Sequence, residues 1–448
     1  MIGWLNRLTG SDSPAAHPLV ASSLWSVMLR VGGALLSFLV GVQLARYLGP
    51  AGFGIYGIIL GIVTLLWAVA QLGLPTLAVR EIARTRAAAD WPALSGVLVW
   101  FPRAAATAGA ALGLLYVAIV LVAPGVSREF LAGTLWAAPL VPVMACTILL
   151  NAELRALDFL LRGQSIEILL RPGATALLLF ALMALQGAMS PAGALAMNLA
   201  GSAFALLVGL VWLRLAVPAP ARLVAPARAP RAWLAAGLPL ALTDVLRQLD
   251  SVYGVLVMGV LATAAETGVF RVAASAIIIV ATPLSVLHVV LAPTLARLHF
   301  ERRTAQLQRL LGIAALLMVG AALAATLFVA LVGQWLIVLL FGAGYAGAWL
   351  PLLILCIAQS AGAFFGVAFI LLGVAEGERE LARAFLVSVG VGIAAAIPLG
   401  LVYGANGVAI AAVVGQSING GLAWTAVRRR MGYDASPFGL LRKAVASA

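Results

Sequence analysis

The segment from Leu234 to Leu261 reads LAAGLPLALTDVLRQLDSVYGVLVMGVL, an apolar run with Asp244, Arg247 and Asp250 in its interior. A helix of about 20 apolar residues can cross a bilayer, so this run predicts a transmembrane helix. A charge in hydrocarbon is costly, and it therefore usually faces a partner or a water-filled cavity. This segment predicts both a membrane fold and a functional interior.

The same kind of apolar run recurs along the whole chain. The 448 residues are 64% hydrophobic and only 10% charged, with a mean hydropathy of +1.11. A soluble domain averages about 25% charged residues, so we expect an all-α integral membrane protein. Turn signals containing Gly, Pro or Asn separate many of the runs. The apolar runs predict twelve transmembrane helices, which cover approximately residues 20–47, 53–76, 96–123, 131–152, 166–187, 191–213, 235–261, 267–291, 309–332, 348–373, 381–403 and 406–427.

Basic residues between these runs predict the orientation. If the N-terminus is cytoplasmic, most of the 28 Lys and Arg fall in inward-facing gaps, and the outward-facing gaps hold only Arg46 and Arg128. This asymmetry is the one that the positive-inside rule describes, so we expect both termini in the cytoplasm. The basic residues form no single stripe, and the net charge of +13 therefore does not indicate nucleic-acid binding.

A hydrophilic stretch rich in Pro and Arg divides the twelve predicted helices into two groups of six. We expect an N-terminal bundle over residues 1–215, a cytoplasmic linker over 216–234, a C-terminal bundle over 235–430 and a cytoplasmic tail over 431–448.

A short internal echo supports two related halves. Gly54-Ile55-Tyr56 resembles Gly268-Val269-Phe270, and positions 54 and 268 differ by an offset of 214 residues. Because each half has an even number of helices, the repeats would run parallel about an axis along the membrane normal. The same offset places Arg30 opposite Asp244.

Arg30 and Arg247 are the candidate substrate-binding residues. Arg247 lies about 20 Å along its helix, close to the bilayer midplane, and Arg30 lies about 16 Å along the first helix with no acidic residue in that helix. Asp244, Arg247 and Asp250 follow an i, i+3, i+6 spacing that brings neighbours within reach. They are either a self-neutralising set that locks helix packing or groups that line a pathway, with Asp244 and Asp250 as candidates for coupling or gating.

Arg103 and Arg271 are weaker cavity candidates. Arg103 lies near a predicted cytoplasmic end and Arg271 near an outer end, so we expect both side chains to extend toward lipid headgroups. Motifs for phosphate-binding loops, zinc proteases and serine hydrolases are missing from the sequence. Cys146 and Cys356 both lie in apolar runs and predict core packing rather than a metal site. We therefore expect no metal, no cofactor and no enzymatic activity.

Several stretches resemble the oligosaccharide (polysaccharide-unit) flippases of the multidrug/oligosaccharidyl-lipid/polysaccharide exporter superfamily. They preserve the order of that family's blocks over nearly the whole chain. The stretches are Ala45-Arg46-Tyr47-Leu48-Gly49-Pro50-Ala51-Gly52-Phe53-Gly54-Ile55-Tyr56, Leu72-Gly73-Leu74-Pro75, Arg80-Glu81-Ile82-Ala83-Arg84, Pro239 to Asp250 with Gly268-Val269-Phe270, Phe341-Gly342 with Tyr345, and Gly404-Ala405-Asn406-Gly407-Val408-Ala409. One departure is Phe270, where the family commonly has Tyr.

The resemblance implies two six-helix bundles around a cavity that opens alternately to either side. It implies a protein of the bacterial inner membrane that moves undecaprenyl-diphosphate-linked glycan units from the inner to the outer leaflet, for cell-surface polysaccharide assembly. Arg30 and Arg247 would meet the diphosphate, which arginine binds bidentately. The implied partners are the lipid-linked glycan, the phospholipid bilayer, an H+ or Na+ coupling ion and the polysaccharide polymerase machinery.

Other functions predict different features. A cation-coupled multidrug antiporter of the same superfamily needs a carboxylate site, which Asp244 or Asp250 could supply. A lipid II flippase typically has fourteen membrane helices rather than twelve. A membrane polymerase or ligase would have a long outer loop, which this chain lacks, and a scaffold would have no reason to retain buried charges.

Overall fold

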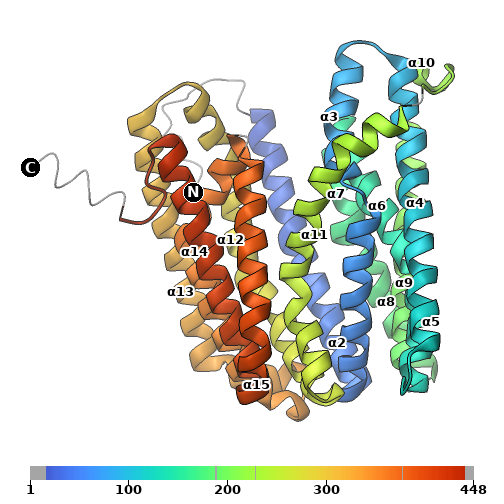
Figure 1. The fold of residues 1–448 in the computed structure, drawn as a ribbon, viewed down its shortest axis with the longest axis vertical. Coiled ribbons are helices and arrows are strands. Elements are labelled where there is room, and N and C mark those ends of the chain that lie inside the picture. Colours follow the sequence, from blue (N-terminus) through green and yellow to red (C-terminus); the bar gives the residue numbers. More distant parts are fainter. Residues whose placement is uncertain (1–16, 187–188, 228, 376, 439–448) are drawn as a thin grey trace, which may run out of the picture.

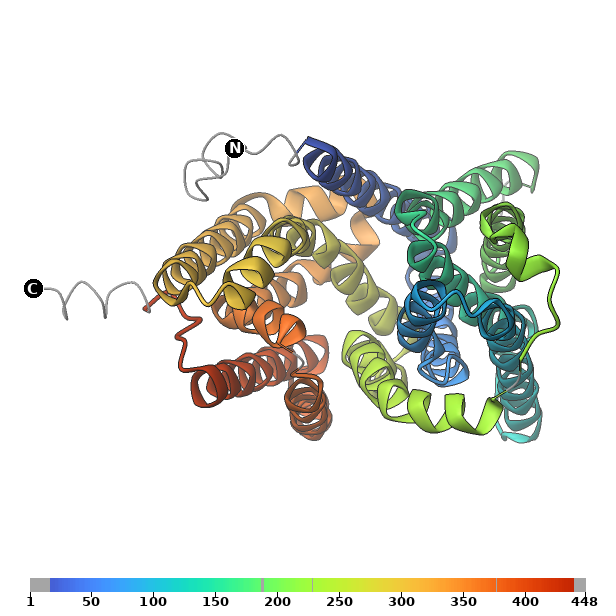
Figure 2. The same cartoon turned by 90° about the horizontal axis from the view of Figure 1, so that it is seen from above.

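The computed structural model describes residues 17–186, 189–227, 229–375 and 377–438, which fold into two helical bundles that lie side by side (Figures 1 and 2). These residues contain no strand. The N-terminal bundle consists of α2 (His17–Ala70), α3 (Leu74–Ala87), α4 (Trp91–Val122), α5 (Arg128–Ala137), α6 (Leu140–Ala156), α7 (Leu160–Ser165), η2 (Ile166–Leu170), α8 (Arg171–Gln186) and α9 (Pro191–Ala216). The connecting α10 (Ala219–Arg222) leads to α11 (Pro230–Leu261), α12 (Ala264–Phe300), α13 (Thr304–Phe341), η3 (Ala343–Ala348), α14 (Trp349–Val374) and α15 (Glu378–Met431).

Two of the longest helices are broken by glycine. Gly49 interrupts α2 with φ 65° and ψ 175°, and Pro50 follows it. Gly404 interrupts α15 with φ 56° and ψ −134°. A positive φ is accessible to glycine without the steric cost that a Cβ adds, so each break turns one continuous helix into two rods. The turn signals at Gly49-Pro50 and Gly404-Ala405-Asn406 are thereby explained.

The described residues contain nine helical stretches that are long and apolar enough to cross a membrane. Two of them contain the breaks at Gly49 and Gly404. The charged helix α11 is not among the nine, although it has 32 residues. The all-α membrane fold is confirmed, whereas the number of crossings and the cytoplasmic position of the termini stay predictions.

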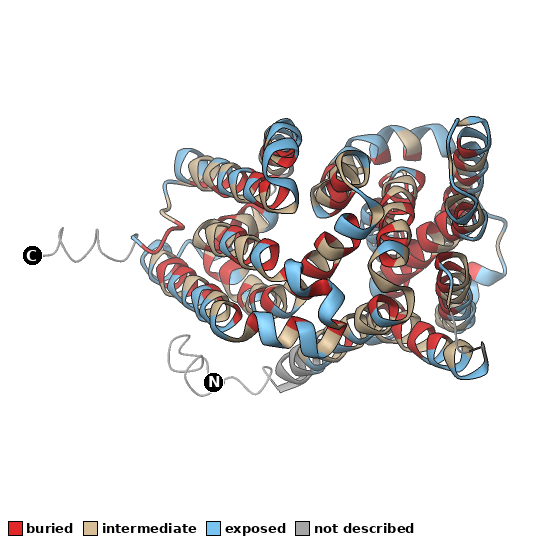
Figure 3. Ribbon diagram, turned by 90° about the horizontal axis from the view of Figure 1, so that it is seen from below, coloured by how far each residue is buried: buried red, intermediate tan, exposed pale blue. Residues whose placement is uncertain are grey.

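Apolar side chains cover the outside of the bundles. Leu114, Val122 and Leu331 are 72%, 84% and 76% exposed, and the outward faces of the helices carry the exposed residues in Figure 3. A large contiguous apolar surface is unfavourable in water and marks a membrane interaction surface. The protein is therefore a multi-pass membrane protein.

The two bundles are packed closely near the break in α2. A Cβ atom added to Gly54 would lie 1.8 Å from the carbonyl oxygen of Ala264, and one added to Gly268 would lie 1.9 Å from that of Pro50. The contact is reciprocal, because Pro50 and Ala264 have the same sequence offset as the two glycines. The residues of the sequence echo thus form one symmetric contact between the halves. We call it the glycine seal.

The glycine seal lies toward the end of the molecule where α11 turns into α12, the lower end in Figure 1. A second contact joins the halves, because the Tyr345 hydroxyl donates a hydrogen bond of 2.8 Å to the Ala45 carbonyl oxygen. Tyr345 is buried and belongs to η3. These contacts hold α2 against the C-terminal bundle at the lower end.

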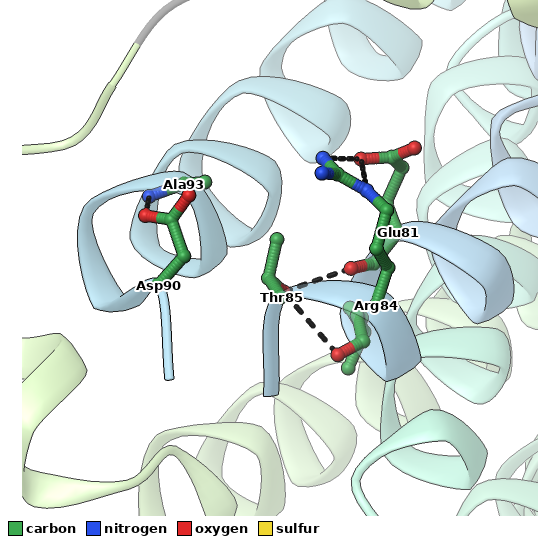
Figure 4. A network of polar contacts seen from close by, with 6 residues as sticks. Glu81, Arg84, Thr85, Asp90 and Ala93 are labelled. Atoms are coloured by element: carbon green, nitrogen blue, oxygen red, sulfur yellow. Dashed lines mark hydrogen bonds and ion pairs between the residues drawn. The ribbon is translucent and has the colours of Figure 1, made fainter. Parts of the chain in front are cut away.

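Ion pairs and caps organise the opposite end, where α3 turns into α4 (Figure 4). Arg84 pairs with Glu81 at 2.6 Å, one helical turn earlier. The Asp90 carboxylate accepts a hydrogen bond of 3.1 Å from the Ala93 backbone N–H and caps α4. Such a cap satisfies one of the backbone donors that a helix start leaves free. The linker returns to this end through a backbone bond of 2.9 Å from Ala227 to the Pro92 carbonyl.

The segment after α15 folds back onto α13. Gln308 exchanges two hydrogen bonds with the Asp434 backbone, at 2.7 and 2.9 Å. The Asp434 carboxylate accepts hydrogen bonds from Trp424, at 2.9 Å, and from the Ser436 hydroxyl, at 2.7 Å. We call this group the Asp434 latch. It connects the ends of α13 and α15.

Candidate functional site

The three charges of α11 do not act as one set. Arg247 pairs with Asp244 at 2.8 Å, one turn earlier on the same helix. Asp250 instead accepts a hydrogen bond of 3.1 Å from the Gln416 side chain of α15. The Arg247 side chain is 64% exposed, although one of its nitrogens is bonded to Asp244. Only one carboxylate therefore offsets the Arg247 charge directly.

Arg30 and Arg247 line the same cavity, which has a volume of 620 Å³ and which we call the arginine cavity. It lies between α11 and the N-terminal bundle. Asp244, which the sequence offset places opposite Arg30, lines it as well. The full lining comprises Arg30, Gln71, Pro75, Thr76, Val79, Arg80, Ile148, Asn151, Arg155, Gln164, Glu167, Ile168, Asp244, Arg247 and Gln248.

The arginine cavity is positively charged. Its four arginines and two carboxylates leave a formal charge of +2. The Nε atom of Arg30 is buried and makes no hydrogen bond to any described residue. Arg155 of α6 lies close enough to Arg30 for the two charges to repel each other. A buried donor without a partner is costly, so this cavity suits an anion that accepts hydrogen bonds.

An irregular helical segment places Glu167, one of the two carboxylates of this cavity. Glu167 belongs to η2, a π-helical stretch between α7 and α8. Its carboxylate accepts a hydrogen bond of 3.0 Å from the Asn151 amide. Gly33 of α2 allows η2 to approach, because a Cβ there would lie 2.6 Å from the Ile168 carbonyl oxygen. Short π-helical insertions are frequent at functional sites.

Asp250 lines a second cavity, of 380 Å³, which lies within the C-terminal bundle. We call it the amide cavity, because Gln359, Gln416 and Asn419 contribute to its wall. Arg247 lines both cavities. The full lining comprises Arg247, Asp250, Ser251, Ala281, Leu284, Ser285, His288, Met318, Gln359, Gly362, Ala363, Gly366, Phe369, Phe385, Gln416 and Asn419.

Arg103 and Arg271 line neither of these cavities. Arg103 is exposed and borders a separate hollow of 320 Å³ between α4 and the linker. Arg271 was expected to extend toward headgroups, but its Nε atom is buried without a hydrogen-bond partner in the described part of the chain. A Cβ added to Gly57 would lie 3.1 Å from the Arg271 Cδ atom, so this side chain packs between the two halves. The expectation failed because a helix of the opposite bundle covers Arg271.

Sequence reasoning missed several residues of the arginine cavity. The predicted topology places Arg80 and Arg155 in cytoplasmic gaps, and no sequence motif marks Asn151, Gln164 or Glu167. Their signal in the sequence is weak, because charges at a helix end are as typical of a cytoplasmic flank as of a cavity wall. Packing of α6 and η2 against α2 brings them to the site.

Solved structures identify the type of fold. A multidrug-resistance MATE-family transporter of the MOP superfamily, in an inward-facing conformation, superposes with a TM-score of 0.75 at 16% identity, over 91% of this chain and 98% of that one. An outward-facing structure described in the same terms gives 0.60 at 17% identity, over 92% and 94%. The lipid II flippase MurJ, in an inward closed conformation, gives 0.69 at 15% identity, over 90% and 87%. The chain thus has the fold of the MOP-superfamily transporters and flippases.

The family follows from the sequence match. A family described as "Polysaccharide biosynthesis protein" matches residues 19–299, which is more than half of the chain. The chain belongs to this family, so the resemblance inferred from the sequence is confirmed. No curated protein matches the chain significantly. The family and the fold are those of transporters and flippases rather than enzymes, as the missing enzyme motifs predicted.

Proposed function

We propose that the protein moves undecaprenyl-diphosphate-linked glycan units from the inner to the outer leaflet of the bacterial inner membrane by alternating access. The observation that carries the proposal is the positive arginine cavity, in which Arg30 and Arg247 face one space and the Arg30 Nε has no partner. A diphosphate offers several charged acceptors, and hydrogen bonds to charged groups contribute about 1.5–3 kcal/mol each. The polyprenyl tail would remain in the surrounding lipid.

The glycine seal supports a conformation that is closed at one end. The Lys and Arg distribution predicts that this end faces outward, so a headgroup would enter the arginine cavity from the cytoplasmic side. An inside-negative membrane potential favours outward movement of an anion by about 2.3 kcal/mol per charge per 100 mV. We propose Asp244 and Asp250 as the sites of H+ coupling.

Cation-coupled drug antiport is the second candidate function, because a solved structure with a similar fold is that of a multidrug-resistance transporter. That function requires a carboxylate free to attract a cation. In the arginine cavity, Asp244 is paired with Arg247 and Glu167 accepts from Asn151, while arginines outnumber carboxylates. The charge of this cavity therefore favours an anionic substrate.

The test is a flipping assay with purified protein in liposomes, with a labelled undecaprenyl-diphosphate-linked saccharide as substrate. Arg30→Gln and Arg247→Gln should each lower the initial rate about tenfold or more, because each removes a charge-assisted contact. Arg103→Gln is the matched control and should retain the wild-type rate. Wild-type rates for both cavity variants would refute the proposed function.

A further inference from the structure

The amide cavity differs from the arginine cavity in the chemistry of its wall. Apart from Arg247, which lines both cavities, its one charged residue is Asp250, whose carboxylate is bonded to Gln416. The remaining polar groups are amides, hydroxyls and an imidazole. Gln359 makes no hydrogen bond to any described residue, so both its donor and its acceptor are available to a ligand. Amides supply donors and acceptors in one plane, which suits a ligand with many hydroxyl groups.

One residue in the wall of the amide cavity, Asn419, has a polar atom without a hydrogen-bond partner. The residue is only 3% exposed, and its Oδ1 atom makes no hydrogen bond within the described chain. Buried polar atoms are nearly always hydrogen-bonded, and an exception calls for an explanation. Because Asn419 lines the amide cavity one turn beyond Gln416, a ligand hydroxyl in the cavity would satisfy it.

Space and apolar surface in this cavity also fit a small organic ligand. A Cβ at Gly362 would approach the Gln416 Oε1 atom to 3.3 Å, so the glycine keeps the amide accessible. Phe369 and Phe385 form one side of the wall, with ring centroids 6.2 Å apart. Electron-rich ring faces suit the weakly positive C–H face of a sugar ring. The volume of 380 Å³ falls within the range of about 300–1,000 Å³ that is typical of small-molecule sites.

Arg247 connects this cavity with the proposed diphosphate site. It lines both cavities, so a phosphate bound to Arg247 would hold its attached group beside the amide cavity. We propose that the amide cavity is the subsite for the sugar linked to the diphosphate, and that it selects a neutral sugar. This inference rests on the proposed function, and it names the substrate class that the function left open.

Two other occupants fit the wall less well. A sugar acid would place its carboxylate near Asp250, and two like charges at short range repel each other. A metal cation prefers several oxygen ligands, whereas the described residues contain no group of three or more His, Cys, Asp or Glu that could hold one. Asp250 alone, already bonded to Gln416, is a poor cation site.

The experiment measures the affinity of the full-length protein for three lipids by native mass spectrometry. The probes are undecaprenyl diphosphate, the same lipid bearing N-acetylglucosamine, and the same lipid bearing glucuronic acid. The neutral sugar should strengthen wild-type binding about three- to tenfold over the sugar-free lipid, as expected for one or two hydrogen bonds. The acidic sugar should produce a smaller gain or none.

Variants test whether the gain in affinity from the neutral sugar arises in the amide cavity. Asn419→Leu and Gln359→Leu should each abolish the gain from the neutral sugar and leave binding of the sugar-free lipid unchanged. Asn406→Leu is the matched control, because Asn406 also belongs to α15 and has a buried Oδ1 without a partner among the described residues, but it does not line the amide cavity. This variant should retain the gain, which excludes a general effect of removing an amide from α15.

The outcomes that would contradict this inference can be distinguished from those that would contradict the proposed function. Wild-type binding of the sugar-free lipid with no gain from the neutral sugar, or an equal gain from the acidic sugar, overturns the inference alone. A gain that persists in both Asn419→Leu and Gln359→Leu also overturns it. If Asn419→Leu changes stabilisation by Na+ and not the gain from the sugar, the cavity is a cation site and the inference is wrong. No binding of any of the three lipids overturns the proposed function, and this inference with it.

Discussion

The arginine cavity and the amide cavity share Arg247 but differ in formal charge and in position. The first is bordered by α11 and the N-terminal bundle and has a formal charge of +2. The second lies in the C-terminal bundle, and its own acidic group is bonded to an amide. Both cavities contain buried polar atoms without a partner among the described residues, which are Arg30 Nε, Asn151 Oδ1 and Gln164 Oε1 in the first and Asn419 Oδ1 in the second. This difference indicates that the arginine cavity recognises charge and that the amide cavity recognises hydroxyl groups.

The largest effect is expected at the glycine seal, because it is a close backbone contact between the two bundles. Gly54→Ala adds a Cβ 1.8 Å from a backbone oxygen, so the bundles must move apart. Hydrogen exchange of residues 50–57 and 264–271 should accelerate about tenfold or more, which corresponds to at least about 1.4 kcal/mol. Gly320→Ala, where a Cβ meets nothing within 4 Å, is the control and should leave exchange unchanged. Unchanged exchange in Gly54→Ala would mean that the seal does not hold the halves together.

Arg155→Gln should affect binding in the arginine cavity and leave binding in the amide cavity unchanged. Arg155 lines only the arginine cavity, so its loss should weaken binding of sugar-free undecaprenyl diphosphate about tenfold, through the lost charge. The further gain from a neutral sugar should remain the same as in the wild type. Isothermal titration with both lipids tests this additivity, and equal loss of the lipid affinity and of the sugar gain would contradict separate subsites.

Asp244→Asn should change the affinity for the diphosphate less than Arg155→Gln does, and it should raise that affinity rather than lower it. It removes the carboxylate that is bonded to Arg247, whose side chain is 64% exposed. Exposed ion pairs contribute only about 0–1 kcal/mol to stability, so the thermal midpoint should change little. The diphosphate affinity should rise by a factor of about two to five as the cavity charge increases. An affinity that falls would show that Asp244 contributes to binding by positioning Arg247.

The smallest effect is expected at the Asp434 latch, which borders neither cavity. Burial alone would raise the pKa of Asp434, but hydrogen bonds from Ser436 and Trp424 outweigh it and lower the pKa below its usual value. The latch therefore stabilises the folded state above the usual pKa of an aspartate, and this stabilisation is lost as the pH falls through the lowered value. Asp434→Ala should lower stability near neutral pH by about 1 kcal/mol or less.

Thermal melts of the wild type and Asp434→Ala over a range of pH provide the measurement. The difference in melting temperature should be constant near neutral pH and should shrink only at strongly acidic pH. Neither lipid affinity should change. A difference that grows as the pH falls would have the wrong sign for this carboxylate.

The sequence predicted the fold where local chemistry is sufficient. Apolar runs and glycine turns predicted the membrane helices. The echo around Gly54 and Gly268 indicated related halves, and the structure places its residues in one reciprocal contact between them. The site was less accessible to sequence reasoning. That Asp250 binds Gln416 rather than Arg247 depends on how α15 packs against α11. The burial of Arg271 and the entry of Arg155 into the cavity likewise depend on helices that are distant in the sequence.

The central claim is that Arg30 and its cavity hold the diphosphate while the amide cavity holds the sugar. The most direct measurement is the affinity for sugar-free undecaprenyl diphosphate in nanodiscs, compared between Arg30→Gln and Asn419→Leu. The expected result is a loss of about tenfold or more in Arg30→Gln and an unchanged affinity in Asn419→Leu. An unchanged affinity in Arg30→Gln, or an equal loss in both variants, would contradict the account.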